Sequence, residues 1–326
     1  MLDGLLGALA WFGRFSDPLA WLSVLAFGAG GLLSWRDSRL ARPVTVAAWG
    51  VFAVFWLSVF HHFAFVQKSF IEGIGVLVAV PTSAYAGFLL ARGRDSLFVL
   101  SRAIAAMGLI FFPFETIPAL QEFLIESVTS QTAFLMELIG ANPTIVSGTA
   151  VPGGSYPDYQ STFWFVDGGH TITYTILIAC TGIGSMAIFG GLIAAVAAPL
   201  SRKLRALAVS IPVIYALNLV RNVFIGLGFG LQKFHFFPDL VMGLFGASDP
   251  YKVSYFIVDR VLAQSLSVLA LVGVTWVVVR ELPEIMVVIE DVLFMATGTE
   301  YDLRGALGVG VREAQRASDS TSGHRP

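Results

Sequence analysis

This chain of 326 residues contains one cysteine and few charged side chains, and its net charge is close to zero. Its single cysteine excludes an internal disulfide, and no closely spaced cysteines and histidines mark a structural zinc site. A formal net charge of −2 gives no reason to expect nucleic-acid binding. Only 13% of the residues are charged, which excludes an ordinary soluble domain. The sequence also has no glycine-rich nucleotide loop, so it indicates neither a cofactor nor a metal.

Hydrophobic residues make up 56% of the chain, and they gather in runs long enough to cross a lipid bilayer. The fold class expected is therefore an all-α polytopic integral membrane protein. A span needs about 20 mostly apolar residues, which predicts a bundle of about seven helices, within a range of about six to eight. The expected spans are residues 18–34, 43–63, 73–91, 97–114, 171–198, 204–231 and 253–279.

Basic residues alternate between the loops in a way that predicts the orientation of the chain. The loops after the first, third and fifth expected spans are basic; they hold Arg36, Arg39, Arg42, Arg92, Arg94, Arg202, Lys203 and Arg205. The connector 115–170 contains neither lysine nor arginine. Because short cytoplasmic loops are enriched in these residues, we expect the N-terminus outside, the C-terminus in the cytoplasm and the connector on the extracytoplasmic side.

The connector has two parts of different character. Residues 118–140 carry apolar side chains at helical intervals with glutamates between them, which predicts an amphipathic helix on the outer surface. Residues 142–170 are rich in proline, glycine and aromatics, which predicts an irregular cap. The expected organisation is N-terminal transmembrane helices at 1–114, the connector at 115–170, a transmembrane core at 171–280 and a cytoplasmic, partly disordered tail at 281–326.

The residues most in need of explanation lie in the last three expected spans. Cys180 is in the first of these, Arg221 in the second and Arg260 in the third. A lone thiol in an apolar helix is most often a packing residue. Arginines inside spans are costly and rare, however, and they generally mark function. From the expected span edges, the three residues lie about 13, 15 and 10 Å below the outer face, which is one shared layer.

These three side chains together suit nucleophilic chemistry. A thiolate is the nucleophilic form of cysteine, and nearby cations lower the pKa of the thiol. Arg221 and Arg260 could stabilise the thiolate, donate to an oxyanion or bind a lipid phosphate, but they cannot act as a base. Asn218 lies on the same helix face as Arg221 and could orient it. His170 is the outside candidate for a base, with a solvated interfacial histidine as the plainer interpretation.

The sequence resembles a known family over about residues 163–276. Ala179-Cys180-Thr181-Gly182, Asn218-Leu219-Val220-Arg221-Asn222 and a basic residue in the next span resemble the exosortase/archaeosortase superfamily of membrane cysteine enzymes. Bacterial exosortases usually have histidine in the third place. Arg260 stands there in this chain, which is similar to the archaeosortase A branch.

The resemblance implies a cell-membrane cysteine peptidase or transpeptidase of the archaeal surface. Its partners would be secreted proteins, such as the S-layer glycoprotein, that carry a C-terminal signal with a Pro-Gly-Phe motif, and a membrane lipid as acyl acceptor. Cys180 would form an acyl thioester, Arg221 would stabilise the thiolate and oxyanion, and Arg260 would donate a proton or stabilise the transition state. The alternative is a transporter or flippase whose arginines bind an anionic lipid or solute while Cys180 is inert.

Overall fold

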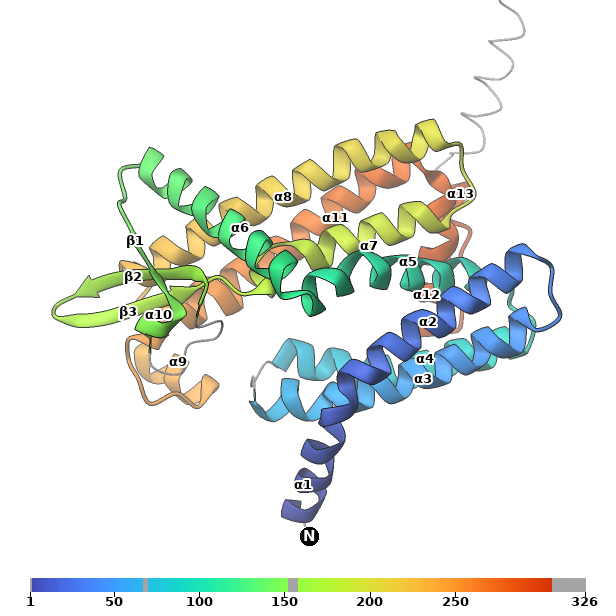
Figure 1. Ribbon diagram of the computed structural model, residues 1–326, viewed down its shortest axis with the longest axis horizontal. Helices are drawn as coiled ribbons and strands as arrows, with labels where there is room; N and C mark the ends of the chain where they lie inside the picture. The colour runs from blue at the N-terminus through green and yellow to red at the C-terminus, as the bar shows by residue number, and fades with distance from the viewer. Residues whose placement is uncertain (1, 67–69, 152–157, 307–326) are drawn as a thin grey trace, which may run out of the picture. The chain divides into compact units, whose positions relative to one another are not determined.

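The structure is a computed structural model that describes residues 2–66, 70–151 and 158–306. It is predominantly helical (Figure 1), and six of its described helical segments are long and apolar enough to cross a membrane. This confirms the expectation of a polytopic membrane protein. The chain forms two compact units. Unit 1 contains residues 1–109, 190–204 and 279–326, and unit 2 contains residues 110–189 and 205–278.

Unit 1 is built mainly from the N-terminal helices. Apart from 3-10 turns and a π-helical turn at His62–Val66, its elements are α1 (Leu2–Phe12), α2 (Ser16–Trp35), α3 (Ala41–His61), α4 (Phe70–Ala91), the first part of α5 (Leu97–Thr116), α12 (Met286–Thr297) and α13 (Leu303–Ala306). Helices α2, α3 and α4 pack side by side (Figure 1). Phe27, Trp49 and Leu90 are buried where they meet. The Trp49 indole donates a 3.0 Å hydrogen bond to Ser101 Oγ of α5, so the one polar atom of this buried ring is satisfied.

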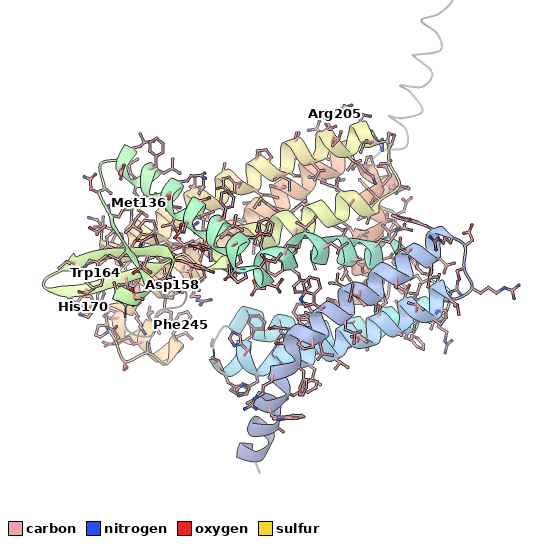
Figure 2. All side chains as sticks on the ribbon, viewed as in Figure 1. Met136, Asp158, Trp164, His170, Arg205 and Phe245 are labelled. Carbon is pink, nitrogen blue, oxygen red and sulfur yellow. The ribbon has the colours of Figure 1, made fainter. Side chains whose placement is uncertain are left out.

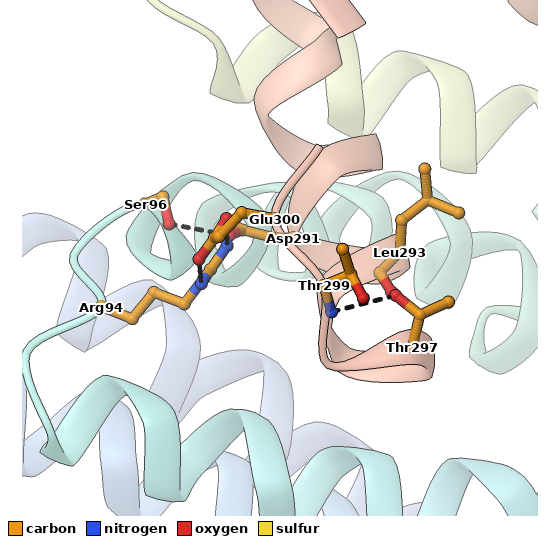
Figure 3. Close-up of polar contacts among 7 residues, drawn as sticks. All are labelled: Arg94, Ser96, Asp291, Leu293, Thr297, Thr299 and Glu300. Atoms are coloured by element: carbon orange, nitrogen blue, oxygen red, sulfur yellow. Dashed lines mark hydrogen bonds and ion pairs between the residues drawn. The ribbon is translucent and has the colours of Figure 1, made fainter. Parts of the chain in front are cut away.

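A polar network ties the α4–α5 loop to α12 within the same unit (Figure 3). Arg94 Nε donates to Asp291 at 2.6 Å, and its other nitrogens bind Glu300. Ser96 also donates to the Asp291 carboxylate, at 2.8 Å. Asp291 is 1% exposed, so this carboxylate needs its partners. Residues 281–306 of the expected tail are thus largely helical and tied to the bundle, whereas residues 307–326 lie outside the described part.

Unit 2 combines long helices with a small sheet. Its main elements are the end of α5, α6 (Pro118–Leu138), β1 (Thr144–Ser147), β2 (Gln160–Asp167), β3 (His170–Thr175), α7 (Ile183–Ala195), α8 (Leu200–Gly230), α9 (Pro238–Phe245), α10 (Lys252–Tyr255) and α11 (Gln264–Glu281). Helices α7, α8 and α11 each continue into unit 1. The strands are antiparallel in the order β1-β2-β3, with Phe163 opposite Tyr174.

The connector contains the helix that the sequence predicted. The residues after this helix are more regular than predicted. Helix α6 begins at Pro118, a residue suited to the first helical turn, and buries Ile125, Val128 and Met136. The stretch 142–170, expected to be irregular, contains β1, β2 and the start of β3 instead. Residues 152–157 of that stretch are outside the described residues.

The expected span 171–198 is corrected by the structure. Only Ile183–Ala195 is helical, a length of about 20 Å, whereas the hydrocarbon core of a bilayer is about 30 Å thick. The preceding residues form β3 and a 3-10 turn. The reason is visible in the side chains: Ile172, Tyr174 and Ile176 alternate with threonines and are all buried, which is the period of a strand. Cys180 therefore lies just before a helix and not inside one.

Candidate active site

Cys180 is the last residue of the short 3-10 turn Ile178–Cys180 that joins β3 to α7. Its amide donates to Leu177 O at 2.8 Å, and the amide of buried Thr181 donates to Ile178 O at 3.1 Å. The Thr181 hydroxyl donates to the same Ile178 carbonyl and accepts from the Ile183 amide at the start of α7. Local hydrogen bonds therefore fix the backbone on both sides of the cysteine.

Gly182 makes the turn into α7 possible. Its φ is +79°, a conformation that residues with a Cβ rarely adopt. A Cβ at this position would also lie 3.0 Å from Asn218 Cγ of α8, closer than nearly all such contacts in proteins. Glycine is thus needed here both for the backbone and for the close approach of α8.

Helix α8 holds the cysteine through two asparagines one turn apart. Asn218 Nδ2 donates to Cys180 O at 2.7 Å, and Asn222 Nδ2 donates to the same oxygen at 2.8 Å. Asn222 is fully buried, and its Oδ1 accepts a 3.3 Å hydrogen bond from the Tyr174 hydroxyl of β3. Tyr174 is also within hydrogen-bonding reach of Cys180, so its single hydroxyl proton can be donated either to Asn222 or to the sulfur. Strand β3, the cysteine turn and α8 are therefore joined in one polar network.

Arg221 lies between these two asparagines in sequence and makes an ion pair with a neighbouring helix. Its Nη2 is 2.8 Å from Asp259 Oδ1, and the two side chains are only 22% and 13% exposed. Arg260 Nε is 3.6 Å from the other Asp259 oxygen, and its guanidinium lies 5.8 Å from the Tyr255 ring centre. Tyr255 also hydrogen-bonds to Asp259. Both arginines therefore form ion pairs with the same carboxylate.

Asp259 and Arg260 lie in the π-helical segment Phe256–Ala263 between α10 and α11. A π-helix has a wider turn than an α-helix, and such segments are frequent at functional sites. Adjacent residues of a regular α-helix point to different faces, yet Asp259 and Arg260 both reach the same cluster. The wider π-helical turn changes the direction of these side chains, so both can reach the cluster.

The charge state of Cys180 reflects two opposing effects. Cys180 lies outside the helical spans, and burial raises the pKa of its thiol. The positive charge of Arg221 and the hydrogen bond from Tyr174 lower that pKa, but less than burial raises it. Burial therefore favours the thiol form of Cys180, whereas Arg221 favours the anion; stabilisation of the thiolate by Arg221 stays a prediction.

A cavity of about 450 Å³ opens beside this cluster in unit 2. Its polar lining comes from Ser185, Asn218, Arg221 and Ser267, and most of its remaining lining is aliphatic, from α8 and α11. This composition suits a ligand with a long hydrocarbon part and one polar group near Arg221.

His170, expected as an outside candidate for a base, does not join the cluster. It begins β3, at the turn between the two long strands (Figure 2), and its ring stacks on Tyr251 at 3.8 Å. Thr175 ends β3, and five residues of strand span about 16 Å, so His170 is at the far end from Cys180. Sequence reasoning gave Tyr174 no role and used Asn222 only as part of a motif, although the alternation around Tyr174 and the i, i+4 spacing of the asparagines could have indicated both. It expected Asp259 only as a structural pair for another helix, and the structure pairs Asp259 with Arg221 of α8.

The family described as transmembrane exosortase (Exosortase_EpsH) matches residues 16–248 of this chain. The chain belongs to the exosortase/archaeosortase superfamily. Archaeosortase A of Haloferax volcanii is 52% identical over 307 residues, which cover 91% of this chain and 99% of that protein. Archaeosortase A of Natronomonas pharaonis is 44% identical over 282 residues, or 86% of this chain and 88% of that one. No solved structure matches this archaeosortase-like chain.

Proposed function

We propose that this archaeosortase-like protein is a membrane cysteine transpeptidase that processes secreted proteins with a C-terminal sorting signal. The signal would contain a Pro-Gly-Phe motif followed by a membrane helix, and the new C-terminus would pass to a membrane lipid. The observation that carries this proposal is the cluster in which Cys180 is fixed by α8 beside the Arg221–Asp259 pair. The S-layer glycoprotein is the substrate that the family resemblance favours.

The reaction has two acyl-transfer steps. In the first, Cys180 Sγ attacks the scissile carbonyl, the carbon–nitrogen bond breaks, the thiol proton leaves with the amine and a thioester forms. In the second, a hydroxyl or amine of the lipid attacks the thioester, and its proton returns to the sulfur as the carbon–sulfur bond breaks. No oxidant or cofactor is needed for either step.

Arg221 is the proposed donor to the oxyanion formed in both steps. The amides of Cys180 and Thr181 already donate within their own turn, so they are not free to bind the substrate oxygen. Arg221 is the cation whose charge acts on Cys180, and a guanidinium has several donors besides the one used by Asp259. A charged donor placed where negative charge develops lowers the barrier.

Arg260 has a different proposed role because it reaches the cluster through Asp259 and Tyr255. It adds positive charge near the shared carboxylate and could bind the lipid headgroup or assist the leaving group. Asp259 is a positioning residue: it holds Arg221 toward the cysteine turn. The proposed acid or base role of His170 is not retained, because His170 lies at the far end of β3.

The depth of the cluster supports an active site that faces outward. Arg221 lies about 13 Å from the end of α8 at Gly230, and Arg260 about 12 Å from the start of α10 at Lys252. By the distribution of basic loops, these helix ends are on the extracytoplasmic side, where a secreted substrate arrives. The N-terminus would then be outside and the C-terminus in the cytoplasm.

The test is to follow processing of a surface protein that carries the signal, in cells that express only Cys180→Ala, Cys180→Ser or the wild type. We expect the unprocessed form to accumulate in both variants, with no lipid label on the substrate. Ser185→Ala, which lines the cavity but bears no proposed chemistry, is the matched control and should process normally. A transporter that uses Arg221 to bind an anion would tolerate Cys180→Ala, so normal processing by that variant would overturn the proposal.

A further inference from the structure

Unit 1 contains an intramembrane arginine of its own. Arg102 lies in α5, five residues after its start at Leu97, and is partly buried. Its stem packs against α2, where a Cβ added to Gly31 would be 3.2 Å from Arg102 Cγ. The Arg102 Nε is inaccessible to solvent and has no hydrogen-bond partner among the described residues. Arginine keeps its charge in proteins, so this is a partly buried cation that lacks a counter-ion among the described residues.

A second cation lies within electrostatic range of Arg102. Lys203, at the start of α8, interacts repulsively with it, and no carboxylate in the described chain contributes to the surroundings of Arg102. Lys203 uses one of its three donors on Ala194 O at 2.8 Å. Glu284 pairs with Arg202 and contributes to the surroundings of neither Arg102 nor Lys203. Two neighbouring cations with unused donors need an anion, and the described part of the protein does not supply one.

We propose that Arg102 and Lys203 form a binding site for the phosphate of an anionic lipid headgroup. Both residues belong to unit 1, and Lys203 lies in one of the basic loops that sequence places on the cytoplasmic side. Basic pockets between transmembrane helices on that side are typical headgroup sites. The guanidinium and the ammonium would each donate to phosphate oxygens, which supplies the counter-ion that Arg102 lacks.

The site is independent of the proposed cysteine chemistry, so it is tested by binding. The full chain is placed in nanodiscs of phosphatidylcholine alone or of phosphatidylcholine with phosphatidylglycerol, and thermal unfolding and the lipids retained in native mass spectrometry are measured. We expect phosphatidylglycerol to raise the unfolding temperature. Arg102→Met and Lys203→Gln should each weaken headgroup binding about fivefold, since each removes a hydrogen bond to the phosphate that contributes about 1 kcal/mol.

Arg39→Gln is the matched control, because it removes an exposed cation of the same unit and should keep the full phosphatidylglycerol effect. In phosphatidylcholine alone, Arg102→Met should fold and be at least as stable as the wild type, since it removes a buried charge without a counter-ion.

Four outcomes would overturn the proposal. The first is that Arg102→Met and Lys203→Gln keep the full lipid effect, and the second is that Arg39→Gln loses as much of that effect as they do. The third is that Arg102→Met fails to fold in phosphatidylcholine, which would show that Arg102 has a structural partner. An equal stabilisation by inorganic phosphate in neutral detergent would assign the site to free phosphate and not to a lipid.

Discussion

Arg221 and Arg102 are both arginines inside long helices, but their surroundings differ. Arg221 is 2.8 Å from Asp259 and lies on α8 between the two asparagines that bind Cys180 O. Arg102 has no hydrogen bond or ion pair among the described residues, and its Nε is buried. Arg221 has a carboxylate partner that the protein itself supplies. Arg102 has none, and in our proposal a lipid phosphate supplies its counter-ion.

The largest effect is expected when Arg221 loses its carboxylate partner, so that it lacks a counter-ion as Arg102 does. Asp259→Asn removes the negative charge and leaves Arg221 buried without its counter-ion, which should lower stability by about 3 kcal/mol. Processing should fall about 100-fold because Arg221 is no longer held toward the cysteine turn. Both quantities are measured on purified protein, by denaturant unfolding and by turnover of a signal peptide substrate.

Two variants decide whether that effect comes from the ion pair. Asp239→Asn, on an exposed part of α9, should change neither quantity. Arg221→Gln/Asp259→Asn should recover stability relative to Asp259→Asn while remaining inactive. A double variant as unstable as the single one would show that Asp259 does not act through Arg221.

The next effect tests whether the turn that contains Cys180 depends on a glycine at position 182. Gly182→Ala should cost about 2 kcal/mol in stability, because alanine resists the left-handed conformation and its Cβ would crowd Asn218. Gly184→Ala, two residues later in α7, meets no atom within 4 Å and should be neutral or slightly stabilising. Equal costs in the two variants would mean that the turn does not depend on Gly182.

The two asparagines should differ in a predictable way. Asn222→Ala removes a donor to Cys180 O and leaves the Tyr174 hydroxyl without its acceptor, so we expect a loss of about 2 kcal/mol. Asn218→Ala removes only one donor to an oxygen that keeps the other, and about 1 kcal/mol is expected. Chemical unfolding of the two variants measures the difference, and the reverse order would contradict the network described.

The smallest effect is a shift in the titration of Cys180. Because burial raises the pKa of this thiol, alkylation by iodoacetamide should be slow at neutral pH and should accelerate only in the alkaline range. Arg221 lowers the pKa of the thiol, so Arg221→Gln should move the alkylation profile to still higher pH, whereas Arg102→Met should leave it unchanged. A profile that moves to lower pH in Arg221→Gln would show that this arginine does not stabilise the anion.

The sequence predicted the parts of this fold that depend on local pattern. The long apolar runs and the amphipathic helix α6 follow from composition and helical spacing, and Cys180 and Arg221 stood out because such residues are rare inside apolar runs. The strand at 170–175 was missed because its buried residues alternate within a run that is apolar on average. The pairing of Asp259 with Arg221 could not be predicted, because the two residues are 38 positions apart and because a π-helical turn changes the face on which Asp259 lies. Pairings of that kind depend on how the helices pack.

The central claim is that Cys180 becomes acylated by the substrate. The most direct measurement is rapid quenching of the purified protein with a signal-bearing substrate in the absence of lipid acceptor, followed by mass spectrometry of the peptide that contains Cys180. The account predicts a substrate-derived acyl group on Cys180 that hydroxylamine removes, and no such adduct in Cys180→Ser. Substrate cleavage that proceeds without any adduct, and that persists in Cys180→Ala, would contradict it.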